Sequence, residues 1–475
     1  MRVRFAPSPT GYLHVGGLRT ALYNYLLARR QGGTFILRIE DTDRTRYVEG
    51  AVDNLMATLR WAGLEFDEGP GAGGQVGPYV QSERLDLYRK YAGELQAGGY
   101  AYPCFCSPER LTEMRKAQEK AGESPKYDRH CLTLSPDERQ ARASEPHVVR
   151  LKVPDGETVT FTDQVRGEVS FDTNTVDDQV LMKSDGYPTY HLANVVDDHL
   201  MGITHVVRGE EWVSSTPKHI LLYRAFGWEA PHFAHLPLLL NPDKSKLSKR
   251  QGDVAVEDYR AKGYLAEALV NFVALLGWNS GTEQEIFSKA ELIQAFSLDR
   301  VNKSGAVFDI NKLNWLNEQY IHKLPVEGML PMVRCWVEKE GYAVPDDATL
   351  AAYMTLMKER VTLVSDFATN ARYLFVDPTS YDEDAVKKRW KDGARELVAD
   401  LQEPLAALPV WDAPALEAAV RTLAESKGVN ASKIIHPLRL AVSGSSAGPG
   451  LFELLAVLGK ERVERRLQAA LKSLP

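Results

Sequence analysis

The stretch from Ala6 to Gly17, Ala-Pro-Ser-Pro-Thr-Gly-Tyr-Leu-His-Val-Gly-Gly, places prolines, glycines and one histidine just before an apolar helical pattern. Glycines such as Gly16 and Gly17 let a phosphate chain approach the backbone closely. A helix that begins here offers unpaired N–H groups and the positive end of its dipole to an anion. His14 can donate a hydrogen bond to a phosphate oxygen. The stretch therefore predicts a nucleotide site, and the alternative is a Pro/Gly turn with a surface histidine.

A second candidate is the basic stretch Lys-Leu-Ser-Lys-Arg, with Lys246 and Lys249 three residues apart. Two ammonium groups in one loop can neutralise the charge that builds up on a triphosphate as it is cleaved. Most runs of Lys and Arg are solvated surface loops. That interpretation stays open for this stretch taken alone.

Three of the four cysteines lie close together in the sequence: Cys104, Cys106 and Cys131. A C-x-C pair and a third thiolate supply most of a tetrahedral zinc site. His130 is adjacent to Cys131, which makes it an awkward fourth ligand. The alternative interpretation is a set of ordinary buried thiols in a reducing compartment.

The elements around the first motif must hold it at the edge of a sheet. Val3 to Phe5 is β-prone, Leu18 to Arg30 carries apolar residues at helical spacing, and Thr34 to Ile39 is again β-prone. Strand, glycine-bearing loop, helix and strand begin a doubly wound parallel sheet, in which ligands bind where strand ends meet helix N-termini. The sequence thus predicts a Rossmann-like α/β domain with residues 6–17 at its nucleotide site.

The rest of the chain divides at changes of pattern, the clearest being a Gly/Pro-rich stretch at 68–80. Residues 1–85 and 187–240 are expected to form the two halves of the Rossmann-like domain, 86–186 an inserted α+β domain, 241–320 a domain with the basic loop, and 321–378 and 379–475 two all-helical domains. Within the helical part, continuous helices are expected over Leu350–Val364 and Pro449–Leu474.

Composition excludes several classes of protein. The chain has 475 residues, 44% hydrophobic and 25% charged, which rules out a collagen-like, coiled-coil or largely disordered chain and predicts several domains. Its 57 Lys and Arg against 64 Asp and Glu give a formal net charge of -7, so a nucleic-acid partner would be held by local basic patches. No apolar segment has the length of a membrane span or the character of a secretory signal, so the expected location is the cytoplasm, with no membrane partner.

The two motifs, as His14-Val-Gly-Gly and Lys246-Leu-Ser-Lys-Arg, resemble the HIGH and KMSKS signatures of the class I aminoacyl-tRNA synthetases. Gly17 in place of the last His and Leu247 in place of the Met depart from those signatures, and both changes are common in one member family. Four stretches are similar to that family, the glutamyl-tRNA synthetases: Arg4–Gly17, Arg38–Asp43, Lys183–His191 and Arg208–Trp212. The resemblance spans the whole catalytic half.

This resemblance implies a glutamate–tRNA ligase that activates L-glutamate with ATP and Mg²⁺ and transfers it to the 3′-terminal adenosine of tRNA(Glu). Pyrophosphate and AMP would be released. Residues 86–186 would bind the acceptor end, 241–320 would contact the stem, and the two helical domains would bind the anticodon. A monomer is the family expectation.

The resemblance also implies roles for single residues. Catalytic stabilisation of phosphate charge is expected from His14, Lys246 and Lys249. ATP binding is expected from Gly16, Gly17, Glu211, Trp212, Leu239 and Lys249. Glutamate binding is expected from Arg4, Ala6, Ser8, Glu40, Tyr190, Asn194 and Arg208. Within that last set, Glu40 is the candidate for the ammonium and the two arginines for the side-chain carboxylate, since a guanidinium can bind it bidentately. The alternative for Arg208 is a structural salt bridge with Glu211.

Two further sites follow from the resemblance. Some relatives bind zinc through such a cysteine cluster with a tyrosine ahead of the last Cys, which gives Cys104, Cys106, Tyr127 and Cys131 as zinc ligands here. Discriminating members place an arginine against the third anticodon base, which is cytosine in glutamate tRNA and guanine in glutamine tRNA. The matching residue is Arg360, and the alternative is a surface arginine paired with Glu359.

Three other functions are weighed against this one. A glutaminyl-tRNA synthetase needs a neutral amide pocket, which the arginines near the site argue against. A short relative that glutamylates a tRNA base lacks the residues after 320. A catalytically inactive tRNA-binding protein is disfavoured by the intact set His14, Glu40, Arg208, Lys246 and Lys249. Whether glutamine tRNA is also charged is left open by the sequence.

Overall fold

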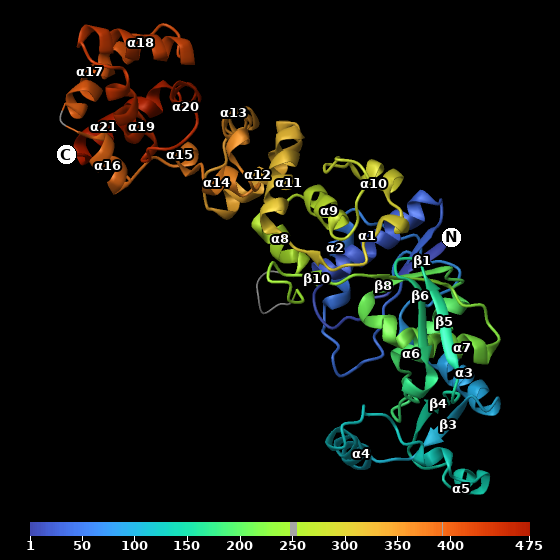
Figure 1. Ribbon diagram of the computed structural model, residues 1–475. Helices are drawn as coiled ribbons and strands as arrows, with labels where there is room; N and C mark the ends of the chain where they lie inside the picture. Colours follow the sequence, from blue (N-terminus) through green and yellow to red (C-terminus); the bar gives the residue numbers. More distant parts are fainter. Residues whose placement is uncertain (248–253, 392) are drawn as a thin grey trace. The chain divides into compact units, whose positions relative to one another are not determined.

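The computed structural model describes residues 1–247, 254–391 and 393–475, and the chain folds into two compact units. The first unit is Met1–Arg260 with Leu269–Ile310, and the second is Ala261–Ala268 with Asn311–Pro475. Each unit is described by itself, with the elements labelled as in Figure 1. Lys249, expected at the ATP phosphates, lies outside the described residues.

A six-stranded sheet lies at the centre of the first unit, in the order β2-β1-β8-β9-β5-β6. Its strands are β1 (Arg2–Phe5), β2 (Thr34–Leu37), β5 (Thr158–Asp163), β6 (Gly167–Asp172), β8 (His205–Gly209) and β9 (His232–Leu236). The first five in sheet order run parallel, and β6 pairs antiparallel with β5. The expected doubly wound sheet is confirmed.

Helix α1 (Val15–Arg30) packs on β1, β2 and β8, with Leu18, Leu22 and Leu26 fully buried. It begins at the N-cap His14, whose ring accepts the Gly16 N–H, so the predicted phosphate loop leads directly into the helix. The other helices of the sheet region are α2 (Ala51–Trp61), α6 (Tyr190–Leu200) and α7 (Thr216–Phe226). These helices bring the loops that follow β1 and β8 to one edge of the sheet.

The inserted region contains a three-stranded antiparallel sheet of β3 (Ala101–Cys104), β4 (Val148–Leu151) and β7 (Val180–Met182). Its helices are α3 (Leu85–Ala97), α4 (Pro108–Lys120) and α5 (Pro136–Ala141), and Figure 1 shows α4 and α5 beside β3 and β4. The hairpin β5-β6 was expected in this inserted domain but instead extends the main sheet, where Asp163 pairs with Phe233 of β9. A local pattern identifies such strands without showing which sheet they join.

The first unit also has a short parallel pair, β10 (Leu239–Leu240) and β11 (Ala306–Val307). Helices α8 (Val256–Lys262) and α9 (Ala266–Leu275) each have residues in both units, and α10 (Lys289–Ala295) belongs to the first. Short 3-10 helices are η1 (Gln81–Arg84), η2 (His130–Leu132), η3 (Thr173–Thr175), η4 (Glu210–Ser215), η6 (Leu298–Arg300) and η7 (Lys358–Arg360).

The second unit is helical throughout its described part, as the sequence predicts. Its helices are α11 (Ile310–Lys323), α12 (Val326–Lys339), α13 (Asp347–Met357), α14 (Asp366–Thr369), α15 (Arg372–Phe375), α16 (Glu383–Arg389), α17 (Ala394–Ala406), α18 (Ala413–Ser426), α19 (Ser432–Ser443), α20 (Leu451–Leu458) and α21 (Lys460–Ser473). One apolar cluster runs from Leu265 to Leu474, so the buried core continues across the expected division at 378/379. None of the helices described in either unit is long and apolar enough to cross a membrane.

Two expected helices are shorter than the pattern suggests. The helix over Leu350–Val364 ends at Met357 and is followed by the turn η7. The helix over Pro449–Leu474 is divided by Gly459, whose φ of 80° ends α20 and redirects the chain before α21. Glycine reaches positive φ without the steric cost that a side chain imposes, so one residue interrupts an otherwise continuous apolar pattern.

Three arginines of helix α21 bind one carboxylate, that of Asp377. The Nε atoms of Arg462, Arg465 and Arg466 donate to Asp377 at 2.9, 2.8 and 2.8 Å. Burial alone would raise the pKa of Asp377, but hydrogen bonds from the three arginines lower it well below its usual range. Arg466 is 1% exposed and also donates to the Tyr373 carbonyl, so the cluster ties the last helix to the segment after α15.

Candidate active site

Two adjoining cavities lie where the loop 6–17 meets the ends of β1, β2 and β8. The larger, of about 970 Å³, is lined by these predicted residues: Arg4, Ala6, Ser8, His14, Gly17, Glu40, Tyr190, Arg208, Glu211 and Trp212. The smaller, of about 300 Å³, shares His14 and Glu211 with it and adds Gly16, Leu239 and Lys246. Asn194 lines neither cavity and is 1% exposed behind the larger one.

His14 has a defined role in the start of α1. Its Nδ1 accepts a hydrogen bond from the Gly16 N–H at 3.1 Å, which assigns the proton of the neutral ring to Nε2. At the next position, a Cβ on Gly17 would lie 2.6 Å from Leu13 Cδ1. A larger residue at position 17 would therefore require the Leu13 side chain to shift.

Lys246 is brought to the smaller cavity by a tight return of the chain along β10. The Leu247 N–H donates to the Leu239 carbonyl at 2.9 Å, and Asn241 Nδ2 donates to the Lys246 carbonyl at 3.3 Å. Leu240 and Lys246 form an antiparallel bridge. The first lysine of the basic stretch thus lines the same cavity as His14, as the motif pairing predicts.

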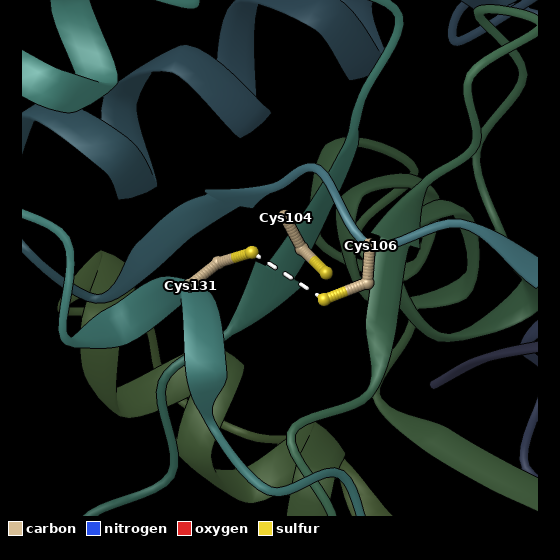
Figure 2. A group of neighbouring side chains, drawn as sticks. All are labelled: Cys104, Cys106 and Cys131. Carbon is tan, nitrogen blue, oxygen red and sulfur yellow. Dashed lines mark hydrogen bonds between the residues drawn. The ribbon is translucent and has the colours of Figure 1, made fainter. Parts of the chain in front are cut away.

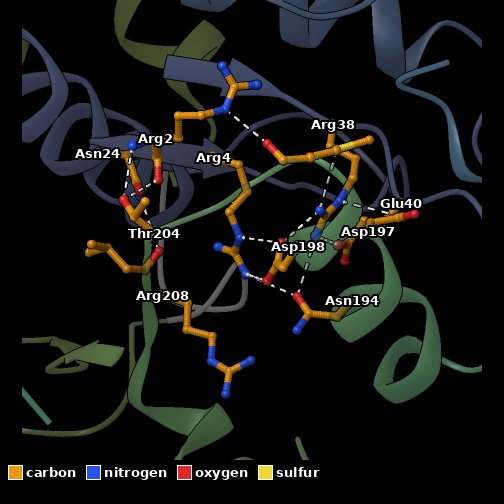
Figure 3. Close-up of polar contacts among 12 residues, drawn as sticks. Arg2, Arg4, Asn24, Arg38, Glu40, Asn194, Asp197, Asp198, Thr204 and Arg208 are labelled. Atoms are coloured by element: carbon orange, nitrogen blue, oxygen red, sulfur yellow. Dashed lines mark hydrogen bonds and ion pairs between the residues drawn. The ribbon is translucent and has the colours of Figure 1, made fainter. Parts of the chain in front are cut away.

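A buried network of charges lies behind the larger cavity (Figure 3). Arg4 Nε and Arg38 Nη1 both donate to Asp198 Oδ1, at 3.0 and 2.7 Å, and Arg38 Nη2 donates to Glu40 Oε1 at 3.0 Å. Asn194 Oδ1 accepts from Arg4 Nη2 at 3.0 Å. Sequence reasoning missed Arg38 and Asp198 as partners, although an acidic pair in the middle of an apolar helix is a signal of buried pairing.

The neighbouring Asp197 accepts a hydrogen bond from a third arginine of the network, Arg84. It accepts from Arg84 Nε at 2.7 Å, from Gln81 Nε2 at 2.8 Å and from the Tyr88 hydroxyl at 2.8 Å. Three carboxylates therefore stand against three guanidiniums in this network, which joins β1, the end of β2, η1 and α6: Glu40, Asp197 and Asp198 with Arg4, Arg38 and Arg84. The buried network is neutral as a whole.

The pKa values of the two acids nearest the cavity follow from this packing. Burial raises the pKa of Glu40, against the opposing attraction of Arg38. Burial also acts on Asp198, but the attraction of Arg4 and Arg38 outweighs it and lowers that pKa. Asp198 is therefore the fixed anion of the network, while Glu40 faces the cavity with part of its charge still uncompensated.

Arg208 differs from Arg4, Arg38 and Arg84, the arginines of this network. It is 5% exposed, and its Nε, Nη1 and Nη2 atoms donate to His235 Nε2, the Tyr190 hydroxyl and Thr216 Oγ1 at 3.0, 2.9 and 3.0 Å. Within residues 1–247, 254–391 and 393–475, no carboxylate forms an ion pair with it, so the expected alternative of a bridge to Glu211 is not observed. Figure 3 shows it apart from the network around Asp198. A buried cation without a neighbouring anion is costly, and Arg208 lines the cavity, so an anionic group placed there would be stabilised.

The three clustered cysteines converge in the inserted region (Figure 2). Their sulfurs lie within 4.8 Å of one another, and the Tyr127 hydroxyl is 3.3 Å from both Cys104 and Cys106. Burial raises the pKa of the Cys106 thiol to about 11, so at neutral pH a metal cation would have to displace its proton. Three thiols and one phenol around a common point are a donor set that suits zinc.

Arg360 lies exposed in η7 of the second unit. Glu359, its expected alternative partner, lies 3.7 Å from His322 Nε2 instead. Among the residues described, no carboxylate pairs with Arg360, while its charge lowers the pKa of Arg439 and opposes the rise that burial causes in the pKa of Tyr373.

Comparison with known proteins supports one family over the whole chain. Residues 1–315 match the catalytic domain of class I tRNA synthetases (E and Q), and residues 326–471 match an anticodon binding domain. A glutamate–tRNA ligase from Chloroherpeton thalassium is 54% identical over 100% of this chain and 98% of its own length, and one from Chlorobium chlorochromatii is 53% identical over 99% and 98%. A crystal structure of a glutamate tRNA ligase from Elizabethkingia meningosepticum in complex with its amino acid is 42% identical, covers 100% of both chains and has a TM-score of 0.94.

Replacing Asp198 with Asn should remove the shared anion while keeping the side-chain shape. We expect the free energy of unfolding of the first unit to fall by about 3–5 kcal/mol at pH 7, because Arg4 and Arg38 lose a buried partner. Urea unfolding, with hydrogen exchange of α6 to locate the loss, measures it. Asp185→Asn, which breaks an exposed pair with Lys183, is the control and should cost less than about 1 kcal/mol.

The difference in unfolding free energy between the wild type and Asp198→Asn should depend on pH in a defined direction. The pKa of Asp198 is lowered from 3.8 in the folded state, so its contribution is complete above 3.8 and is lost as the pH falls through the folded value. The difference between the wild type and Asp198→Asn should therefore shrink on acidification below 3.8. A difference that grew with acid would contradict the assignment of Asp198 as the fixed anion.

Proposed function

This chain belongs to the glutamate–tRNA ligases of the class I tRNA synthetases, and we propose that its two adjoining cavities hold L-glutamate and ATP for that reaction. The α-carboxylate of glutamate attacks the α-phosphorus of ATP, and pyrophosphate leaves. The glutamyl group then passes to a ribose hydroxyl of the 3′-terminal adenosine of tRNA(Glu), and AMP leaves. The attacking carboxylate is already an anion, so the first step needs no general base and depends on positioning and charge.

The uncompensated charge of Arg208 is the observation that carries the assignment of the amino-acid site. The network around Asp198 is neutral, and Arg208 presents to the cavity a positive charge that no carboxylate of the described chain contacts directly. Glutamate has one ammonium and two carboxylates, and therefore one surplus negative charge. Its side-chain carboxylate binds Arg208 and its ammonium binds Glu40, whereas the amide of glutamine would leave the guanidinium unpaired.

The remaining glutamate-binding residues complete this arrangement. Arg4 uses Nε and Nη2 for Asp198 and Asn194, which leaves Nη1 for the substrate. Tyr190 lines the cavity beside Arg208 and offers its hydroxyl as a neutral partner. Ala6 and Ser8 contribute the edge of the phosphate loop, and Asn194 acts from behind by holding Arg4.

ATP occupies the smaller cavity and its junction with the larger one. Gly16, Gly17 and Leu239 allow the nucleotide to approach the backbone, and Glu211 and Trp212 lie at the junction. His14 donates from Nε2, and Lys246, with Lys249 beyond the described residues, neutralises the pyrophosphate as it leaves. Mg²⁺ on the phosphate oxygens would supply further positive charge.

The inserted region and the second unit hold the tRNA at its two ends. Residues 86–186 bind the acceptor end, 241–320 contact the stem, and 321–378 and 379–475 bind the anticodon, with Arg360 at its third base. Support for the last point is the match of residues 326–471 to an anticodon binding domain and the exposed, unpaired guanidinium of Arg360 in the described chain. The protein acts as a cytoplasmic monomer in this proposal.

Arg208→Gln tests the amino-acid site. We expect the KM for glutamate to rise by about 100-fold or more, because removing one partner of a buried charge pair costs on the order of 3 kcal/mol, while the KM for ATP stays within about threefold. Aminoacylation kinetics of the full chain measure both. Arg29→Gln is the matched control, because Arg29 is a half-buried arginine of α1 that pairs with Asp67. An unchanged KM for glutamate in Arg208→Gln would refute the proposed site.

The cysteine cluster should bind one zinc ion per chain through Cys104, Cys106, Cys131 and Tyr127. Elemental analysis of protein purified with zinc present should find about one equivalent. Cys106→Ser should lose it, whereas Cys335→Ser, which changes the exposed cysteine of α12, should keep it. Equal zinc content in the two variants would exclude the cluster as the site.

Arg360→Gln tests anticodon discrimination. A guanidinium can donate a hydrogen bond to the carbonyl of cytosine, but it is large enough to crowd a purine at the same position. Loss of the guanidinium should therefore reduce the preference for glutamate tRNA over glutamine tRNA by about tenfold. Aminoacylation with each purified tRNA gives the ratio. Arg421→Gln, an exposed arginine of α18 paired with Glu417, should leave it unchanged. An equal ratio of glutamate-tRNA to glutamine-tRNA charging in the two variants would contradict the role of Arg360 in anticodon discrimination.

A further inference from the structure

We propose that Asp163 is a positioning residue that acts through His235 to hold the guanidinium of Arg208 in the orientation that receives the side-chain carboxylate of glutamate. This inference rests on the proposed role of Arg208. Asp163 ends β5 and His235 lies in β9, so the edge hairpin of the main sheet reaches the amino-acid site from behind. Neither side chain lines the cavity, and both are fully buried.

Asp163 is held by several donors at once. Its Oδ2 lies 2.6 Å from His235 Nδ1 and also accepts the His235 backbone N–H at 3.1 Å. Its Oδ1 accepts the backbone N–H groups of Val165 and Arg166 at 3.0 and 2.9 Å. Burial would raise the pKa of Asp163, but the hydrogen bond from His235 and those from the backbone lower it. The side chain is therefore an ionised carboxylate, which can only accept.

This carboxylate decides which ring nitrogen of His235 carries the proton. Since Oδ2 can only accept, Nδ1 must donate, and the proton of the neutral ring sits on Nδ1. Burial lowers the pKa of His235 and keeps the ring neutral. Nε2 is then left with a lone pair, which accepts from Arg208 Nε at 3.0 Å. The chain Asp163, His235, Arg208 fixes the guanidinium at its Nε corner.

The imidazole between the two charges has a further consequence. A carboxylate in direct contact with Arg208 would neutralise it, as Asp198 does for Arg4, and would remove the positive charge that the substrate needs. His235 transmits the orienting effect of Asp163 while keeping that anion one ring away. Arg208 is thereby oriented without being neutralised.

The other face of Arg208 follows the same pattern. His219 Nδ1 lies 3.2 Å from both Nη1 and Nη2, and His219 Nε2 lies 3.1 Å from His191 Nδ1. Burial lowers the pKa of His219 well below its usual range and that of His191 to about 3, so both rings are neutral. With Tyr190 and Thr216, every hydrogen-bond partner of the Arg208 guanidinium in the described chain is a neutral acceptor.

Asp163→Asn separates this role from a structural one. An Asn side chain can keep its oxygen at Oδ1, which preserves the turn through Val165 and Arg166, and then presents an NH₂ group to His235 Nδ1. The ring proton must move to Nε2, where it opposes the N–H of Arg208 Nε. We expect the KM for glutamate to rise about 10- to 100-fold with the KM for ATP unchanged.

The matched control lies at the other end of the same hairpin. Asp172 Oδ1 accepts the Asn174 N–H at 2.8 Å in a similar turn, but no imidazole adjoins it among these contacts. Asp172→Asn should leave both KM values unchanged. A rise in the KM for glutamate as large as that of Asp163→Asn would assign the effect to the hairpin and overturn the proposal.

The proton on His235 can be observed directly in the full chain with ¹⁵N-labelled histidine, the signal being assigned by its loss in His235→Gln. The wild type should show the proton on Nδ1 and Asp163→Asn should show it on Nε2. A wild-type ring with its proton on Nε2 overturns the proposal even if the variant fails to fold.

A double-mutant cycle completes the test. His235→Phe removes both ring nitrogens, so Asp163 has no ring proton to place. In the His235→Phe background, Asp163→Asn should change the KM for glutamate by less than about threefold. The same factor in both backgrounds overturns the positioning role while leaving the proposed function intact, provided that Arg208→Gln raises that KM. An unchanged KM in Arg208→Gln overturns the proposed function itself.

Discussion

Charge cannot be buried cheaply without an opposite charge nearby, and this constraint organises the first unit. Three arginines and three acids, drawn from β1, the end of β2, η1 and α6, cancel one another behind the larger cavity. These charges compensate one another only when the strands and helices that carry them are packed in this arrangement. Against that neutral background, the guanidinium of Arg208 lines the larger cavity without a contacting carboxylate in the described chain, and in the proposed function it is the group that the substrate carboxylate binds.

The phosphate chemistry depends on a different and more local principle. The loop before α1 and the return of the chain along β10 each place one polar side chain, His14 and Lys246, by short backbone hydrogen bonds. Both side chains line the smaller cavity. In the proposed function, amino-acid selection therefore rests on long-range ion pairs, whereas phosphate binding rests on two loops whose geometry is set within a few residues.

This division explains what the sequence could and could not reveal. The start of α1 and the helical second unit follow from local spacing, and the predicted ATP- and glutamate-binding residues line the cavities, apart from Asn194 and from Lys249, which lies outside the described residues. Arg38 and Asp198 are 160 positions apart, and His235 and Asp163 are 72 apart, so no local pattern pairs them. The hairpin β5-β6 belongs to the main sheet because of its tertiary pairing with β9, which no local pattern shows. The break between α20 and α21 depends on the single positive φ angle of Gly459.

The carboxylate of Asp377 offers a last consequence, which concerns how this chain can change over evolutionary time. Three guanidiniums of α21 converge on that one acid, so its loss alone would leave three like charges facing one another with one of them buried. The dependence on the acid differs among them, because the side chain of Arg466 is 1% exposed whereas that of Arg465 is 60% exposed and can be solvated without it. A change at Asp377 is therefore expected to be tolerated only together with a change at the buried Arg466.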